Sequence, residues 1–186
     1  MNLRNFFHLL ILLLPLSISA QGVSETWKSD LEAVLAEFKA CEAPEDNMAL
    51  CHNFLDKALE TVYGVNAFYS EEKQRFLIGN EIVELLGQSA NWEPLGNGSD
   101  TEALQNAQDQ ANAGKAVVAA YSAPDGSGHI ALIIPGKSSP SGKWQSSVPN
   151  AASFFMDDHA RSFVGKPLSY SFKGEIRSEV FLYMRK

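Results

Sequence analysis

The chain contains the stretch Lys115-Ala116-Val117-Val118-Ala119-Ala120-Tyr121, followed by His129-Ile130-Ala131-Leu132-Ile133-Ile134, and these two apolar runs decide the fold. Short apolar runs bounded by glycine and proline predict buried β-strands. The segment between them, 122–128, holds Pro124, Asp125 and two glycines, and therefore predicts a turn. The two runs are expected to form a β-hairpin.

The segments before this hairpin have helical spacing of their apolar residues. Helices are expected over residues 24–41, 48–63, 70–86 and 100–113, with a loop over 91–98. Gly64 and Gly87 follow two of these segments, and glycine commonly ends a helix. After the hairpin, further strands are expected over 144–148, 170–172 and 179–184, with an irregular or helical piece over 149–159. This order predicts an α+β fold in which N-terminal helices pack on a small antiparallel sheet.

The first twenty residues have the layout of a secretory signal peptide. Arg4 is followed by an apolar core over 6–16 and by small residues up to Ala20. A retained membrane anchor is the competing interpretation, but a transmembrane helix needs about 20 apolar residues. We therefore expect a signal peptide over 1–20 and a single domain over 21–186, located outside the cell or in the periplasm.

Composition excludes several classes of function. The formal net charge of the chain is −7, and it becomes −8 when the segment with Arg4 is removed. An acidic chain that lacks a basic run is a poor nucleic-acid binder, so this class of function is excluded. Hydrophobic residues make up 45% of the chain, which is too many for a disordered protein. A second long apolar segment is absent, so no stable membrane insertion is expected after signal removal. No HExxH, CxxC or phosphate-binding glycine motif occurs, and we predict no cofactor and no metal.

Cys51 opens an amphipathic segment and is the candidate nucleophile. The N-terminus of a helix carries a partial positive charge that favours thiolate over thiol. The alternative is a Cys41–Cys51 disulfide, because exported proteins usually meet an oxidising compartment. In the catalytic interpretation Cys51 is free and Cys41 is a small buried hydrophobic residue.

His129 is the candidate base, because it follows a glycine-rich turn and precedes an apolar strand that would fix its position. A histidine at the surface end of a strand is the competing interpretation. His52 is a poor base for Cys51, since adjacent helical residues point about 100° apart.

The imidazole needs a third group to orient it, and Asn150 is the candidate. Gln145 and Ser147 are second choices, and Asp157 and Asp158 are more distant ones. Asn150 is equally suited to capping a short helix over 151–156.

These residues resemble the papain-like cysteine peptidases of bacterial cell walls, the NlpC/P60 and CHAP groups. Cys51-x-x-Phe54 is similar to their nucleophile helix, Gly128-His129 and the apolar residues after it are similar to their base strand, and Asn150 lies where they place a polar residue. The resemblance covers about residues 48–155. Leu50 and His52 depart from the usual residues on either side of the cysteine, and the segment 64–114 matches nothing in the group.

The resemblance implies an amidase or endopeptidase that cleaves peptidoglycan peptides through an acyl-enzyme on Cys51. Trp92, Tyr121 and Trp144 would line the groove or, alternatively, belong to the core.

Two rival hypotheses are a catalytically inactive member of the same fold that binds wall fragments or a protein, and a secreted structural or inhibitor domain. A Cys51 sulfur within about 4 Å of a His129 ring nitrogen favours the papain-like hypotheses. A Cys41–Cys51 disulfide counts against both of them and favours the structural domain.

Overall fold

The computed structural model describes residues 23–42 and 51–186. The predicted signal peptide over 1–20 and the predicted start of the second helix before Cys51 lie outside the described residues. Within the described part of the chain, no helix is long and apolar enough to cross a membrane.

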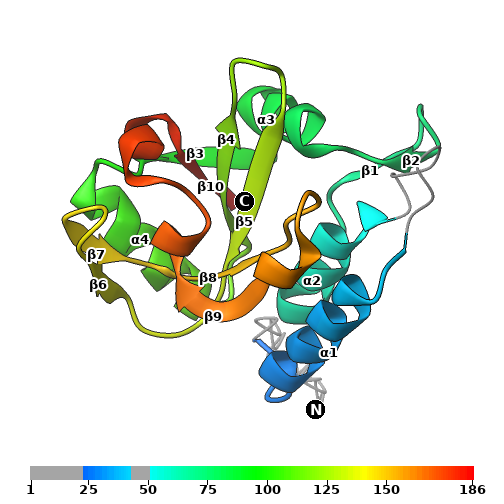
Figure 1. Ribbon diagram of the computed structural model, residues 1–186, viewed down its shortest axis with the longest axis horizontal. Coiled ribbons are helices and arrows are strands. Elements are labelled where there is room, and N and C mark those ends of the chain that lie inside the picture. The colour runs from blue at the N-terminus through cyan, green and yellow to red at the C-terminus, as the bar shows by residue number, and fades with distance from the viewer. Residues whose placement is uncertain (1–22, 43–50) are drawn as a thin grey trace, which may run out of the picture.

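A six-stranded antiparallel sheet forms the centre of the molecule (Figure 1). Its strands are, in spatial order, β3 (Trp92–Asn97), β10 (Phe181–Arg185), β4 (Val117–Ser122), β5 (Gly128–Ile133), β8 (Asn150–Ser153) and β9 (Phe163–Pro167). The predicted hairpin is β4 and β5, in which Ala119 pairs with Ala131 and Tyr121 with His129. Because β4 and β5 lie inside the sheet, most of their side chains are buried, as their apolar sequences predict.

Four helices surround the sheet: α1 (Trp27–Lys39), α2 (Phe54–Tyr63), α3 (Gly79–Gln88) and α4 (Thr101–Asn112). Helices α1 and α2 lie side by side and contact β9 and β5, whereas α3 contacts β5 and β4, and α4 contacts β3 and β10 (Figure 1). The remaining elements are short: β1 (Tyr69–Ser70), β2 (Arg75–Phe76), β6 (Ser139–Ser141), β7 (Ser146–Val148) and the 3-10 turns η2 (His159–Arg161), η3 (Leu168–Tyr170) and η4 (Gly174–Glu179). This combination of helices with antiparallel sheets confirms the predicted α+β class.

Several predicted elements differ from the structure. The segment 70–78 begins with the β1–β2 hairpin, so α3 is shorter than predicted, and the predicted loop 91–98 contains strand β3. The predicted helix over 151–156 is wrong, because residues 150–153 form β8 and pair with β5 on one side and β9 on the other. The predicted strand over 170–172 is also wrong, and β9 was not predicted.

Two contacts fix α2 and the segment after it against the sheet. The hydroxyl of Tyr63 donates to the carbonyl oxygen of Ile133 on β5 at 2.6 Å. The buried carboxylate of Asp56 accepts from the backbone N–H groups of Ala67 and Phe68, and burial raises the pKa of this carboxyl. These bonds satisfy polar groups that would otherwise be costly inside the core.

A close approach of two glycines joins α3 to β5. A Cβ atom built on Gly79 would lie 2.2 Å from the carbonyl oxygen of Gly128, and one built on Gly128 would lie 2.5 Å from the carbonyl carbon of Gly79. No real side chain tolerates such distances, so both positions require glycine. The start of α3 therefore lies directly against the start of β5, beside His129.

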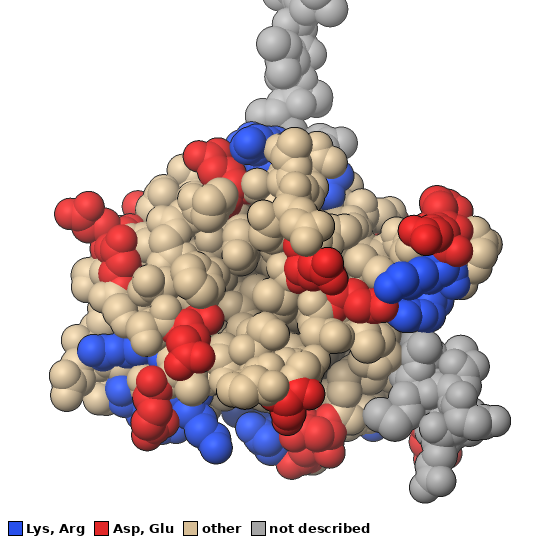
Figure 2. Space-filling model, turned by 90° about the horizontal axis from the view of Figure 1, so that it is seen from above, with Lys and Arg blue, Asp and Glu red and all other residues tan. Residues whose placement is uncertain are grey.

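On the face shown in Figure 2, charged side chains do not form a basic patch. The basic side chains lie at its margin, interspersed with acidic ones, and most of the remaining surface is uncharged. This distribution agrees with the negative net charge and supports neither a nucleic-acid interface nor an anionic membrane surface on this face.

Candidate functional site

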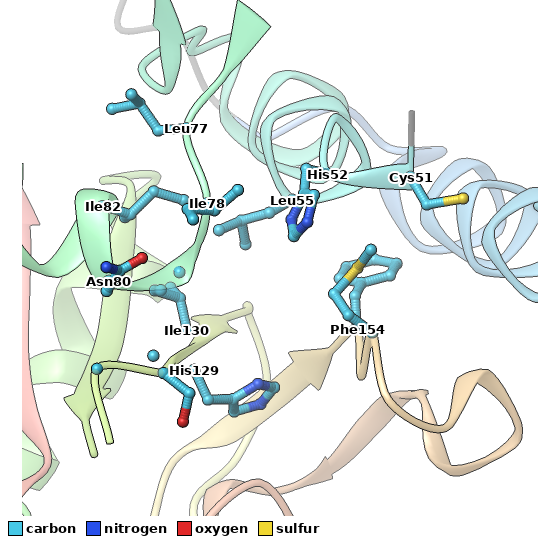
Figure 3. A pocket seen from close by; sticks show the side chains of 15 residues that line it. Cys51, His52, Leu55, Leu77, Ile78, Asn80, Ile82, His129, Ile130 and Phe154 are labelled. Carbon is cyan, nitrogen blue, oxygen red and sulfur yellow. The ribbon is translucent and has the colours of Figure 1, made fainter. Parts of the chain in front are cut away.

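A cavity of about 320 Å³ lies where the approach to α2, the start of α3 and the start of β5 meet (Figure 3). Cys51, His52 and Leu55 border it from the α2 side, and His129 borders it from β5. Two of the three predicted site residues, Cys51 and His129, therefore line one cavity although they are far apart in the sequence.

Cys51 is bonded to Cys41 in a disulfide, with Cα atoms 6.2 Å apart. Its side chain is buried, and in Figure 3 its sulfur points out of the cavity, away from His129. The chain has two cysteines, so this bond leaves neither as a thiol. The prediction of a free Cys51 is wrong for this form of the protein, which has the disulfide expected for an exported chain.

The predicted position of Cys51 at the head of a helix also needs correction. Helix α2 begins at Phe54, with Asn53 as its N-cap residue, and Cys51 lies in a turn before it. The effect of the helix dipole is confined to the first turn, so it acts on Cys51 more weakly than the sequence predicts.

His129 is held rigidly at the start of β5. Its Nε2 atom lies 2.7 Å from the hydroxyl oxygen of Ser153 on β8, and its ring stacks on Phe155 with centroids 4.5 Å apart and planes 5° apart. Phe172 contacts the imidazole edge-on. The other ring nitrogen, Nδ1, has no hydrogen-bond partner among the described residues.

Burial lowers the pKa of His129 from 6.5 to about 4. The carboxylate of Asp157 acts in the opposite direction, and the charge of Arg161 adds to the lowering. The imidazole is therefore neutral near pH 7, as a proton acceptor must be.

Asn150 does not orient His129. Its side-chain nitrogen donates to the carbonyl oxygen of Pro135, at the far end of β5 from His129. Ser153 occupies the predicted role instead, because it lies on β8 three residues further along the chain. Gln145 and Ser147 precede β8, and neither has a hydrogen bond to His129 within the described chain.

His52 is a site residue that the sequence argument set aside. Its imidazole points into the cavity in Figure 3, and burial lowers its pKa, with Arg75 adding to the effect and Glu81 opposing it. Its place next to Cys51 makes it unsuitable as a base for that residue, but it remains available to contact a ligand. The fact that two histidines face one cavity is visible only in the folded chain.

The predicted aromatic lining divides between core and site. Trp92 is buried and stacks on Phe68 with ring centroids 5.8 Å apart, and Trp144 is fully buried with its indole N–H directed to the carbonyl oxygen of Phe172. Tyr121, in contrast, borders a second cavity, which Trp92 and Trp144 do not line.

A second cavity, of about 580 Å³, lies on the other side of His129. Ser127, Gly128, His129 and Met156 border both cavities. The imidazole of His129 thus borders both cavities. Among the described residues, no group of three or more His, Cys, Asp or Glu side chains is placed to hold a metal ion.

No protein-family model matches the chain, and a search of curated proteins found no match. The site must therefore be interpreted from its own geometry.

Proposed function

We propose that this chain is an exported cysteine hydrolase that cleaves amide bonds in peptidoglycan peptides and that the disulfide form is its resting state. The observation that carries the proposal is the shared cavity, which is lined by both Cys51 and His129 and lies where the approach to α2, the start of α3 and the start of β5 meet. The signal-like N-terminus and the resemblance to cell-wall peptidases support the choice of substrate.

Activation requires reduction of the Cys41–Cys51 bond by an external dithiol. Thiol–disulfide exchange converts the disulfide into two thiols and converts the dithiol into its own disulfide, so two electrons and two protons pass to the protein. The freed Cys51 side chain is then able to rotate about its Cα–Cβ bond toward His129. A closed ring over residues 41–51 would prevent this movement.

In the reduced enzyme His129 accepts the thiol proton of Cys51 on Nδ1, since Nε2 is engaged by Ser153. The thiolate attacks the carbonyl carbon of the scissile amide, and the imidazolium donates its proton to the leaving amine as the C–N bond breaks. Water, deprotonated by His129, then hydrolyses the thioester, which releases a carboxylic acid and restores the thiol. A neighbouring thiolate favours the charged form of His129, which offsets the effect of burial on its pKa.

The experiment compares the wild type with two cysteine variants on purified peptidoglycan, with and without dithiothreitol. The wild type should release soluble fragments only with reductant, Cys41→Ser should release them under both conditions, and Cys51→Ser under neither. Mass spectrometry of the fragments identifies the bond that is cut. Cys41→Ser is the matched control, because it breaks the same disulfide and keeps the nucleophile.

The proposal fails if reduced wild type and Cys41→Ser are both folded and both leave peptidoglycan intact. Labelling gives an independent check at neutral pH: iodoacetamide should modify Cys51 faster than Cys41 in the reduced protein. Equal rates would argue against an activated thiol.

The disulfide favours a second candidate, a secreted structural or inhibitor domain that is stabilised by the Cys41–Cys51 bond and binds a protein without cleaving it. In that case the cavity beside His52 and His129 is a binding site, and reduction lowers stability without producing activity. The same experiment separates the two candidates, because only the hydrolase gains turnover when Cys41 is replaced.

A further inference from the structure

The second cavity combines an aromatic wall with a charged rim. Its wall includes Phe155 and Phe172, the two rings that also hold His129. Its rim carries Arg161, Lys173 and Asp157, all of them exposed. The three rim charges sum to +1 on a protein whose net charge is −7, so this cavity differs in charge from the chain as a whole.

Ser171 supplies a buried polar group at the same place. It borders the cavity, its side chain is 8% exposed, and its hydroxyl oxygen has no hydrogen-bond partner among the described residues. A buried hydroxyl without a partner costs free energy unless a ligand or a water molecule bonds to it. Ser171 borders the same cavity as Arg161 and Lys173, and this combination of a hydroxyl group with two cations favours an anionic ligand group.

Arg161 is available to such a ligand. Its guanidinium lies over the ring of Phe155, 4.5 Å from the ring centroid, and its ion pair with Asp157 is long, at 3.7 Å, and solvent-exposed. Exposed ion pairs contribute little to stability, so replacing Asp157 by a ligand carboxylate as the partner of Arg161 costs little free energy. A planar guanidinium also matches a carboxylate in a bidentate geometry.

We propose that the second cavity is a substrate subsite that selects a peptide carboxylate through Arg161, Lys173 and Ser171. The inference rests on the proposed function, because it divides the substrate between the two cavities. The carboxylate lies in the second cavity, and the scissile bond lies in the first cavity, on the other side of His129. The apolar walls accept the aliphatic part of the residue that carries the carboxylate. Asp157 limits the affinity, since it occupies Arg161 and repels an incoming anion.

The test uses binding to the oxidised wild-type protein, so that no cleavage is needed. Acetyl-Ala-Ala-Ala with a free C-terminal carboxylate, its C-terminal amide, and acetyl-Ala-Glu-Ala-amide are titrated and followed by NMR. Acetyl-Ala-Ala-Ala should bind roughly fivefold to tenfold more tightly than its C-terminal amide, because a charge-assisted hydrogen bond contributes a difference of about this size. The glutamate peptide shows whether a side-chain carboxylate serves as well.

Variants then assign the contact. The double variant Arg161→Gln/Lys173→Gln should reduce the carboxylate preference to less than about twofold, Ser171→Ala should weaken carboxylate binding about threefold, and Asp157→Asn should strengthen it about twofold to threefold. Lys115→Gln, an exposed lysine outside both cavity linings, should change nothing.

Three results would overturn the inference: no detectable binding of the carboxylate peptide, equal affinity for the peptide and its amide, or a preference that survives in the double variant. Shifts at Leu55 and Ile82 rather than at Phe172 would assign the ligand to the first cavity and would overturn it as well. Failure of the hydrolase proposal is recognised separately, because it shows as absent cleavage by reduced protein whatever the binding result.

Discussion

Cys51 and His129 border the same cavity, yet the structure holds them in opposite ways. His129 is fixed by a hydrogen bond to Ser153, by a parallel stack on Phe155 and by its place in a six-stranded sheet. Cys51 is tied by one covalent bond to Cys41, in a turn before α2. The first arrangement depends on many weak contacts within the fold, whereas the second depends on the redox state of the surroundings.

The two halves of the proposed catalytic pair are therefore prepared by different means. The proposed base, His129, is preorganised by packing and is present whenever the chain is folded. The proposed nucleophile, Cys51, is conditional, because reduction must release it. Three experiments test this contrast.

The largest expected effect concerns the dependence of stability on pH at His129. Its folded-state pKa of about 4 lies below the ordinary value of 6.5, so the unfolded chain binds the proton first as the pH falls. The stability that the neutral ring contributes above pH 6.5 should therefore be lost between pH 6.5 and pH 4, by up to about 3 kcal/mol.

Chemical denaturation of wild type and His129→Gln at pH 7 and pH 4 measures this loss. Glutamine keeps a polar group opposite Ser153 and does not titrate, whereas His52 and Glu81 titrate in both proteins and cancel in the difference. Equal losses of stability in the two proteins would show that His129 is not the buried neutral group described here.

The next effect concerns the disulfide. Cys41→Ser opens a ring of about ten residues and should lower the free energy of unfolding by about 2–3 kcal/mol. Denaturant titration of the variant without reductant should match that of the wild type with reductant. A variant as stable as the oxidised wild type would indicate that the bond stabilises the fold little and that its main effect falls on Cys51.

The smallest expected effect separates Ser153 from Asn150. Ser153→Ala removes the hydrogen bond to Nε2 of His129 and should reduce kcat/KM of the reduced enzyme about tenfold, with a changed pH profile. Asn150→Ala removes the bond to Pro135 at the other end of β5 and should leave kcat/KM unchanged. Comparable losses in the two variants would mean that general stability, and not orientation of the ring, governs the rate.

The parts of the fold that depend on local signals could be predicted from sequence. The β4–β5 hairpin is confirmed, and it was predictable because turn residues bound each apolar run. Helix α4 is also confirmed. It begins after Asp100, whose carboxylate accepts from the N–H groups of Glu102 and Ala103. Strand β3 was missed because Pro94 and Gly96 indicate a loop. It becomes a strand by pairing with β10, which comes from the other end of the chain.

The candidate site shows the same division. His129 was found because its position at the head of a strand is visible in the sequence. Ser153, the hydrogen-bond partner of His129, could not be identified from the sequence. Choosing it over Asn150 requires the register of β5 against β8, in which Ala131 pairs with Ser153. The sequence is compatible with both a Cys41–Cys51 disulfide and a free thiol, and the folded structure contains the disulfide.

The contact between Gly79 and Gly128 has a consequence for how this site is able to change. At this contact the cavity wall consists of backbone against backbone, so an added methyl group at either position meets main-chain atoms within about 2.5 Å. Substitutions therefore cannot narrow the cavity here without moving α3 or β5. Variation in ligand size, whether by evolution or by design, is expected to come from side chains that line the cavity elsewhere, such as His52 and Leu55.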